Sequence, residues 1–286
     1  MKLWRYILCL GLVLGFCFSN PVTNSVSAPP LLFVPAKQQG GAEDPAATSL
    51  TNFVAYWKTD EESGTRFDQS ANDQALTDNN TVTFAAGVKG NAASFASASS
   101  EKLSRADSAT LSMGDIDYSF CCWVKFTTLT SNAGNGRGIM GKFDIGAGER
   151  EWLLYWNDYE GSSLYYVLSS TGNVAEQTAL RASSFGAPST GVWYFVVCWY
   201  DAAANTANIQ VNNSTVDSTS YTGGSNNGGA VFLFGKYANS SIWDIYHNGL
   251  IDEAMVAKRV WTAAERTYLY NSGAGRTYNP GTGKFE

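Results

Sequence analysis

Two long apolar segments limit the fold of this chain more than any other feature. Residues 118–126 and 193–200 are rich in aromatic and β-branched side chains, and each is apolar at both odd and even positions. Aromatic and β-branched residues favour strands, and a strand that is apolar on both sides is buried on both faces. The two segments therefore predict central strands of a sheet that has protein packed against each side.

Shorter apolar segments, separated by Gly, Asn, Asp and Ser, follow the same strand-and-turn pattern. They are residues 53–57, 139–143, 152–156, 164–168, 209–211, 231–234 and 250–256. Many short strands joined by polar turns are typical of sandwiches and barrels. One helix is expected near the end, where Thr262 and Glu265 have capping-box spacing and Asn271-Ser272-Gly273 ends it, with Gly as the left-handed terminator. The fold class predicted is all-β, a two-sheet antiparallel sandwich with one short C-terminal helix.

The N-terminus has the pattern of an export signal. Lys2 and Arg5 precede an apolar run over residues 6–18, and Val26-Ser27-Ala28 resembles a cleavage site. We expect a signal peptide over residues 1–28, a secreted or cell-surface location, and no membrane insertion after cleavage. An uncleaved anchor and a lipidated Cys17 are the alternatives.

Beyond this signal the chain divides into three parts. Residues 29–49 are rich in Pro and Gly and predict an extended linker. Residues 50–275 contain the strand pattern and predict one domain, since sandwiches commonly exceed 200 residues. Residues 276–286 are expected to be a frayed tail.

The charge balance argues against nucleic acid as a partner. Two of the 19 Lys and Arg residues lie in the signal, which leaves 17 basic against 25 acidic side chains, a net charge of −8. A phosphate backbone would be repelled by such a surface, because its binding depends on clustered Lys and Arg.

Three cysteines remain after the signal, namely Cys121, Cys122 and Cys198. Neighbouring residues of a strand point to opposite faces, so at most one of Cys121 and Cys122 can meet Cys198. The simplest prediction is three buried, small apolar side chains, and their spacing does not suggest a zinc site.

The order of several motifs resembles the concanavalin A-like and laminin G-like jelly-roll superfamily. The most specific is the closing segment, Gly249-Leu250-Ile251-Asp252-Glu253-Ala254, followed by the helix start at Trp261. The other matching segments are residues 54–58, 60–65, 68–72, 87–95, 118–125, 193–197 and 269–271. The resemblance covers about 225 residues and implies a jelly-roll sandwich.

The resemblance implies a non-catalytic module that binds carbohydrate or a cell-surface polymer. Glucanases of this superfamily use an E-x-D-x-E strand motif, and no segment of the chain has it: Glu149-Arg150-Glu151 lacks the central Asp. Asp252 and Glu253 are adjacent, so they should face opposite sides. The single histidine, His247, is expected to be a loop residue without a catalytic partner. A structural or adhesive protein that binds protein partners, and a divergent glycoside hydrolase, are the alternatives.

The resemblance also implies a structural Ca²⁺ near the junction of the first and last strands. It suggests Asp68 and Asp252 as ligands, with Asp60 as a third candidate, because Ca²⁺ prefers carboxylate and carbonyl oxygens. The alternative is that Asp68 caps a turn and Asp252 is a hydrogen-bonded acid at a strand end.

A sugar site needs exposed aromatic faces with polar side chains beside them. Two groups have this composition: Trp156, Asn157, Asp158 and Tyr159, and then Trp243 with Tyr246. Trp156 and Tyr159 are next to a turn and are expected to be the most exposed.

Overall fold

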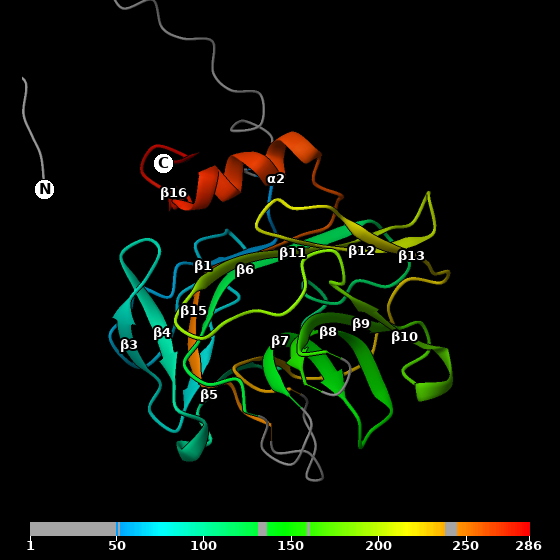
Figure 1. Ribbon diagram of the computed structural model, residues 1–286, viewed down its shortest axis with the longest axis horizontal. Helices are drawn as coiled ribbons and strands as arrows, with labels where there is room; N and C mark the ends of the chain where they lie inside the picture. The colour runs from blue at the N-terminus through cyan, green and yellow to red at the C-terminus, as the bar shows by residue number, and fades with distance from the viewer. Residues whose placement is uncertain (1–49, 51, 131–135, 159–160, 238–244) are drawn as a thin grey trace, which may run out of the picture. The chain divides into compact units, whose positions relative to one another are not determined.

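The computed structural model describes residues 50, 52–130, 136–158, 161–237 and 245–286. In these residues two antiparallel sheets lie face to face (Figure 1), which confirms the predicted two-sheet sandwich with one short C-terminal helix. The predicted signal peptide and linker, residues 1–49, lie outside the described residues.

The first sheet, here called sheet I, is built around the two segments that the sequence singled out. Its strands, in spatial order, are β13 (Asp217–Ser220), β12 (Thr206–Val211), β11 (Trp193–Asp201), β6 (Tyr118–Phe126), β15 (Gly249–Ala257), β4 (Asn91–Phe95) and β3 (Thr83–Ala86), with β1 (Ala55–Trp57) also paired to β15. β6 and β11 are central strands, as predicted, and pair in register from Trp193 opposite Lys125 to Tyr200 opposite Tyr118.

The second sheet, sheet II, forms the opposite layer of the sandwich. Its strands, in spatial order, are β10 (Gln177–Arg181), β9 (Ser163–Ser169), β8 (Glu149–Asn157), β7 (Arg137–Asp144), β14 (Phe232–Phe234), β5 (Lys102–Arg105) and β2 (Thr77–Asn79). Short 3₁₀ turns occur at η1 (Ser97–Ser99), η2 (Val174–Glu176) and η3 (Asn271–Gly273). The 3₁₀ turn η2 leads directly into the edge strand β10.

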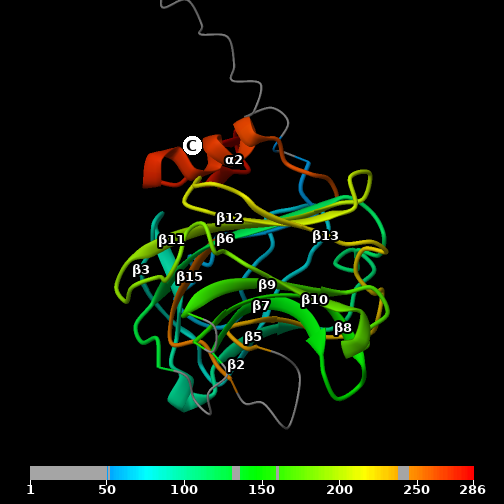
Figure 2. The ribbon, with the colours of Figure 1, turned by 45° about the vertical axis from the view of Figure 1, so that its right-hand side comes forward.

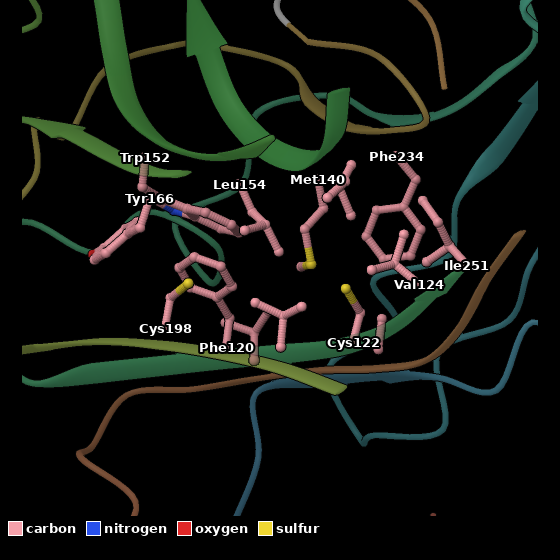
Figure 3. Close-up of a cluster of buried hydrophobic side chains, with 14 of the residues drawn as sticks. Phe120, Cys122, Val124, Met140, Trp152, Leu154, Tyr166, Cys198, Phe234 and Ile251 are labelled. Carbon is pink, nitrogen blue, oxygen red and sulfur yellow. The ribbon is translucent and has the colours of Figure 1, made fainter. Parts of the chain in front are cut away.

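The main core lies between the sheets and is filled by alternate residues of facing strands. From sheet I, Phe120 stacks on Trp152 of sheet II with ring centroids 4.3 Å apart. Figure 3 shows Phe120, Cys122 and Val124 of β6 facing Trp152, Leu154 and Met140 of sheet II across the interface. This alternation is the strand period of two, which sends every second side chain inward.

The outer face of sheet I is also buried, which explains why β6 and β11 are apolar on both sides. Helix α2 (Ala263–Tyr270) lies over this face in both views (Figures 1 and 2). The residues packed there, the helix-side cluster, are Leu50, Phe53, Tyr56, Cys121, Trp123, Phe195, Val197, Trp199, Met255, Ala257, Trp261, Leu269 and Phe285.

Helix α2 begins as the sequence predicts. The Thr262 side chain accepts from the Glu265 amide at 3.2 Å, and the Glu265 carboxylate accepts from the Thr262 amide at 2.7 Å. The terminator differs from the expectation: Asn271 is the left-handed C-cap with φ 47°, ahead of Gly273. Asn tolerates this conformation because its short amide can bond locally, here to the Gly275 carbonyl at 3.0 Å. None of the helices that the structure describes is long and apolar enough to cross a membrane.

Residues 276–286 differ from the predicted frayed tail. They contain a hairpin of β16 (Tyr278–Asn279) and β17 (Lys284–Phe285). Phe285 is buried, and its ring lies 5.6 Å from that of Tyr56 and 6.2 Å from that of Phe53. Aromatic burial against the outer face of sheet I therefore orders a segment that looks polar in sequence.

The three cysteines of the domain are free and buried, as predicted. Cys122 and Cys198 lie in the main core, whereas Cys121 points to the helix-side cluster on the opposite face of sheet I. All three behave as small apolar side chains in this structure.

Candidate functional site

The outer face of sheet II carries a cluster of aromatic and aliphatic side chains that no helix of the described residues covers (Figure 1). We call it the outer-face cluster, and its residues are Phe143, Leu153, Tyr155, Tyr165 and Val167, with Ile145 and Tyr237 packed against them. Because Trp152, Leu154 and Trp156 point into the main core, strand alternation sends Leu153 and Tyr155 outward. The strands of sheet II are curved (Figure 2).

Tyr155 is the centre of the aromatic arrangement. Its ring centroid lies 4.9 Å from that of Tyr237, edge to face at 80°, and 5.5 Å from that of Tyr165. Phe143 adds a fourth ring, 6.3 Å from Tyr237. Such packed rings hold one another in place; Phe143, Tyr155 and Tyr165 are buried, whereas Tyr237 is only partly buried and is the ring most available to a ligand.

A pocket of about 200 Å³ opens beside these rings, and we call it the face pocket. It is lined by Phe143, Ile145, Arg150, Tyr155, Asn157, Val174, Gln177 and Tyr237. The pocket thus combines aromatic walls with two amides and one guanidinium. Val174 is 68% exposed, so an apolar side chain is presented to solvent at its edge.

The polar groups of the face pocket are held by local hydrogen bonds. Arg150 donates from Nη1 to the Gly172 carbonyl at 3.0 Å and from Nη2 to the Ile145 carbonyl at 3.4 Å. The Asn157 amide donates to the Tyr155 hydroxyl at 3.4 Å. Burial raises the pKa of Tyr237, so its phenol is neutral at physiological pH. Among the described lining residues, Arg150 alone carries a formal charge.

Of the predicted ligand-binding residues that the structure describes, Asn157 alone lines the face pocket. Trp156 is 1% exposed and lies in the main core, its ring 6.4 Å from that of Phe126, so the expectation that it is exposed is wrong. Asp158 interacts electrostatically with the buried Arg137 instead. Tyr246 is buried, with Lys236 Nζ 5.1 Å from its ring centre. Tyr159 and Trp243 lie outside the described residues.

Seven of the eight described lining residues of this pocket were not predicted from the sequence, among them Tyr155, Tyr237, Arg150 and Gln177. Neighbouring side chains of a strand point to opposite faces, so an inward Trp156 requires an outward Tyr155. In a strand that is apolar throughout residues 152–156, however, the sequence does not indicate which set of side chains faces the core.

Two of the predicted metal ligands meet the same turn, which connects β3 to β4. Asp252 is fully buried, and its Oδ2 accepts from the Val88 amide at 2.7 Å and the Lys89 amide at 3.2 Å. Asp60 Oδ1 accepts from the Asn91 amide of that turn at 2.8 Å. Asp252 Oδ1 is buried without a hydrogen-bond partner of acceptable geometry among the described residues. Burial raises the pKa of Asp252, and the nearby Asp60 carboxylate adds to that rise.

The oxygens of this pair suit a hard cation. Asp252 offers a carboxylate oxygen that has no hydrogen-bond partner among the described residues, and Asp60 offers a second carboxylate at the same turn. A Ca²⁺ here would also need backbone carbonyls, because the described residues contain no group of three or more His, Cys, Asp or Glu side chains arranged to hold a metal. Asp68 has a different environment. Its two oxygens accept from the amides of Tyr56, Ser70 and Gln74 at 2.8–2.9 Å, the arrangement of a turn cap.

The other candidate acids and bases are buried away from the face pocket. Glu253 lies at a bulge of β15 with φ 48° and accepts from the Tyr56 hydroxyl, whereas its neighbour Asp252 bonds the turn at Val88. His247 is fully buried against the rings of Phe95 and Phe126. Burial lowers the pKa of His247 to about 3, so it remains neutral.

Comparison with solved structures places the sandwich among domains of one architecture. Domain 4 of AbnA, a GH43 extracellular arabinanase from Geobacillus stearothermophilus solved with arabinotriose, is 19% identical with a TM-score of 0.56. The match covers 76% of this chain and 97% of that domain. A search of curated proteins finds no match.

Two toxin structures share the fold over part of their length. The binding domain of Paraclostridial Mosquitocidal Protein 1 is 15% identical with a TM-score of 0.60, over 78% of this chain and 52% of that one. A structure of botulinum neurotoxin type C, whose cell entry depends upon interaction with two ganglioside molecules, is 13% identical with a TM-score of 0.56, over 78% and 52%. The chain thus spans about half the length of these toxin structures.

A family model matches residues 97–265, from η1 to the first turn of α2, and so includes both central strands of sheet I and the aromatic strands of sheet II. That match covers more than half of the chain and agrees with the motifs and the sandwich described above. The chain therefore belongs to the concanavalin A-like lectin/glucanases superfamily.

Proposed function

We propose that this domain is a non-catalytic carbohydrate-binding module whose site is the face pocket. The observation that carries the proposal is the pairing of the Tyr155 and Tyr237 rings with the polar groups of Arg150, Asn157 and Gln177 in one pocket. Aromatic rings pack against the C–H faces of a sugar, and amides and guanidinium hydrogen-bond its hydroxyls, so a concave site of this composition suits a glycan.

The chemistry of the pocket supports binding without catalysis. Glycoside hydrolysis uses a pair of carboxylates flanking the scissile bond. The described lining of the face pocket contains no Asp or Glu. Two proteins of similar fold support the proposal of carbohydrate binding. The arabinanase domain was solved with arabinotriose, and cell entry of botulinum neurotoxin type C depends upon interaction with gangliosides.

We also propose that the module acts outside the cell. This rests on the signal-like residues 1–28 and the Pro- and Gly-rich residues 29–49, which would present the sandwich at a distance from its point of attachment or export. One fold relative belongs to an extracellular enzyme. Detecting the protein in the culture medium or on the surface of its native host, after fractionation, tests this; a purely cytoplasmic pool would contradict it.

Binding is tested on a glycan array, followed by calorimetric titration with arabino-, xylo-, cello- and malto-oligosaccharides. We expect Tyr237→Ala and Gln177→Ala to weaken binding about tenfold each, because each removes one wall or one amide of the pocket. Matched controls are Tyr268→Ala on α2 and Gln69→Ala on the loop after β1, which lie away from the pocket. Equal affinity of the pocket variants and the controls would exclude the face pocket as the site.

Calcium is a second proposed ligand, held by Asp252 and Asp60 with backbone carbonyls and serving a structural role. A saturating cation binds only the folded state, so Ca²⁺ at 100-fold over Kd should stabilise the protein by about 3 kcal/mol. The test is the melting temperature and titration heat of chelator-treated protein on addition of Ca²⁺, with Asp252→Asn as the variant and Asp68→Asn as the control. No heat and no rise in melting temperature in the wild type would rule out the site.

A further inference from the structure

A second pocket, of about 450 Å³, lies at the rim of the sandwich next to the face pocket. We call it the rim pocket, and it is lined by Ser170, Ala175, Glu176, Gln177, Thr178, Ser220, Tyr221 and Thr222. Its walls come from β10, the edge strand of sheet II, and from the end of β13, the edge strand of sheet I. The rim pocket therefore sits where the two sheets meet.

The two pockets are adjacent along the chain and share a residue. In the 3₁₀ turn η2, Val174 lines the face pocket, while the next two residues, Ala175 and Glu176, line the rim pocket. Gln177, which follows them, lines both. The turn η2 therefore forms a low ridge between the face pocket and the rim pocket. Its exposed Val174 offers an apolar contact to a ligand that passes from one pocket to the other.

The linings of the two pockets differ in chemistry. The face pocket has three aromatic side chains among its eight lining residues, whereas the rim pocket is lined mainly by hydroxyls, those of Ser170, Thr178, Ser220, Tyr221 and Thr222. A hydroxyl both donates and accepts, which matches the hydroxyls of a sugar better than it matches a fixed charge. Tyr221 also fixes the ridge, since its hydroxyl donates to the Glu176 carbonyl at 2.8 Å, and burial raises the pKa of Tyr221, which keeps the phenol neutral.

We infer that the face pocket and the rim pocket form one groove for a neutral oligosaccharide of at least two sugar rings. One ring stacks beside Tyr155 and Tyr237, the linkage crosses the ridge at Val174 and Gln177, and the next ring occupies the hydroxyl-lined rim pocket. A uronic or sialic acid in the rim pocket would meet the carboxylate of Glu176, so neutral sugars are favoured there. This inference rests on the proposed function and adds to it the length and charge class of the ligand.

The test is the dependence of affinity on chain length. Calorimetric titration of the full protein uses mono-, di-, tri- and tetrasaccharides of the arabino-, xylo-, cello- and malto-series. We expect affinity to rise about tenfold or more once the ligand is long enough to enter the second pocket. Ser220→Ile, which narrows the rim pocket and removes a hydroxyl, should abolish that gain.

Ser218→Ile is the matched control, because Ser218 is the same residue type, is also exposed, and lies two positions away on the same face of β13, yet outside the rim pocket. Thr178→Val, which removes a lining hydroxyl with little change of shape, is the second variant. Melting temperatures of all three confirm that they fold.

The outcomes separate the two claims. Affinity that is independent of chain length, or unchanged in both Ser220→Ile and Thr178→Val, overturns the groove and leaves a single-pocket module. Tighter binding of sialylated or uronate oligosaccharides than of neutral ones overturns the charge class. No binding of any oligosaccharide of any length overturns the groove together with the proposed function.

Discussion

Lys142 is a fully buried charge at the edge of the main core, and its partners are all close. Its ammonium lies 2.7 Å from Glu151 Oε1 and 2.6 Å from Asp107 Oδ1, and it donates to the Ser112 hydroxyl at 2.7 Å. Glu151 sits where the pairing of β7 and β8 is irregular, which turns its side chain toward Lys142. Removing either carboxyl group leaves the buried Lys142 ammonium with one partner fewer, so the group acts as a unit.

This group makes stability depend on pH. Burial raises the pKa of Glu151 from 4.5 to about 7, and this outweighs the opposing effect of Lys142. The folded state then holds a proton that the unfolded state has lost, so stability falls by about 3 kcal/mol as pH rises from about 4.5 to about 7. The Lys142 hydrogen bond lowers the pKa of the half-exposed Asp107, whose contribution therefore changes below this window.

We predict that Glu151→Gln flattens this part of the pH profile. The measurement is the free energy of unfolding in denaturant at a series of values from roughly pH 5 to pH 8. Glu149→Gln, a partly exposed carboxylate two residues earlier on β8, is the control and should keep the slope of the wild type. An unchanged slope in Glu151→Gln would refute the role given to that carboxylate.

At the scale of single residues, the sequence predicted the burial of a side chain better than the sheet face to which the side chain points. Burial of the three cysteines follows from their place in apolar strands, and the structure confirms it. The orientation of Trp156 and Tyr155 does not follow, because both faces of β8 are apolar and either phase of alternation is compatible with the sequence.

Among the elements, central strands were predictable and edge strands were not. β6 and β11 are long, apolar and buried on both faces, so their residues alone indicate their place. β10 and β13 are short and largely polar, and they exist because they pair with β9 and β12. Such pairing depends on residues distant in sequence and leaves little local signal. Gln177 and Ser220 lie on these edge strands, so the groove could not be located from the sequence.

The start of α2 is the element-level prediction that the structure confirms in atomic detail. The Thr262–Glu265 capping box satisfies two backbone amides, and Arg259 holds the Glu265 carboxylate at 2.8 Å. We predict that Thr262→Ala lowers the free energy of unfolding by about 1 kcal/mol, since the cap hydrogen bond is lost.

Denaturant unfolding measures the effect, and Thr267→Ala in the exposed middle of the same helix is the control. The better helix propensity of Ala offsets the loss of the exposed hydrogen bond from the Thr267 hydroxyl to Asn213 Oδ1, so the control should be close to neutral. A loss in Thr267→Ala equal to that in Thr262→Ala would show that the cap is not the cause.

At the scale of the whole molecule, the two sheets differ in what covers their outer faces. Helix α2 and the C-terminal hairpin bury that of sheet I, so its aromatic residues belong to a second core. The outer face of sheet II carries its rings beside a pocket and an edge groove. The first face stabilises the fold, and we assign ligand binding to the second.

The assignment of ligand binding to the outer face of sheet II is tested most directly by a crystal structure of the protein with the oligosaccharide that binds it most tightly. The predicted result is a sugar ring in the face pocket beside Tyr155 and Tyr237, with the chain crossing Gln177 toward Ser220. A sugar bound elsewhere on the sandwich, with the face pocket vacant, would contradict the account.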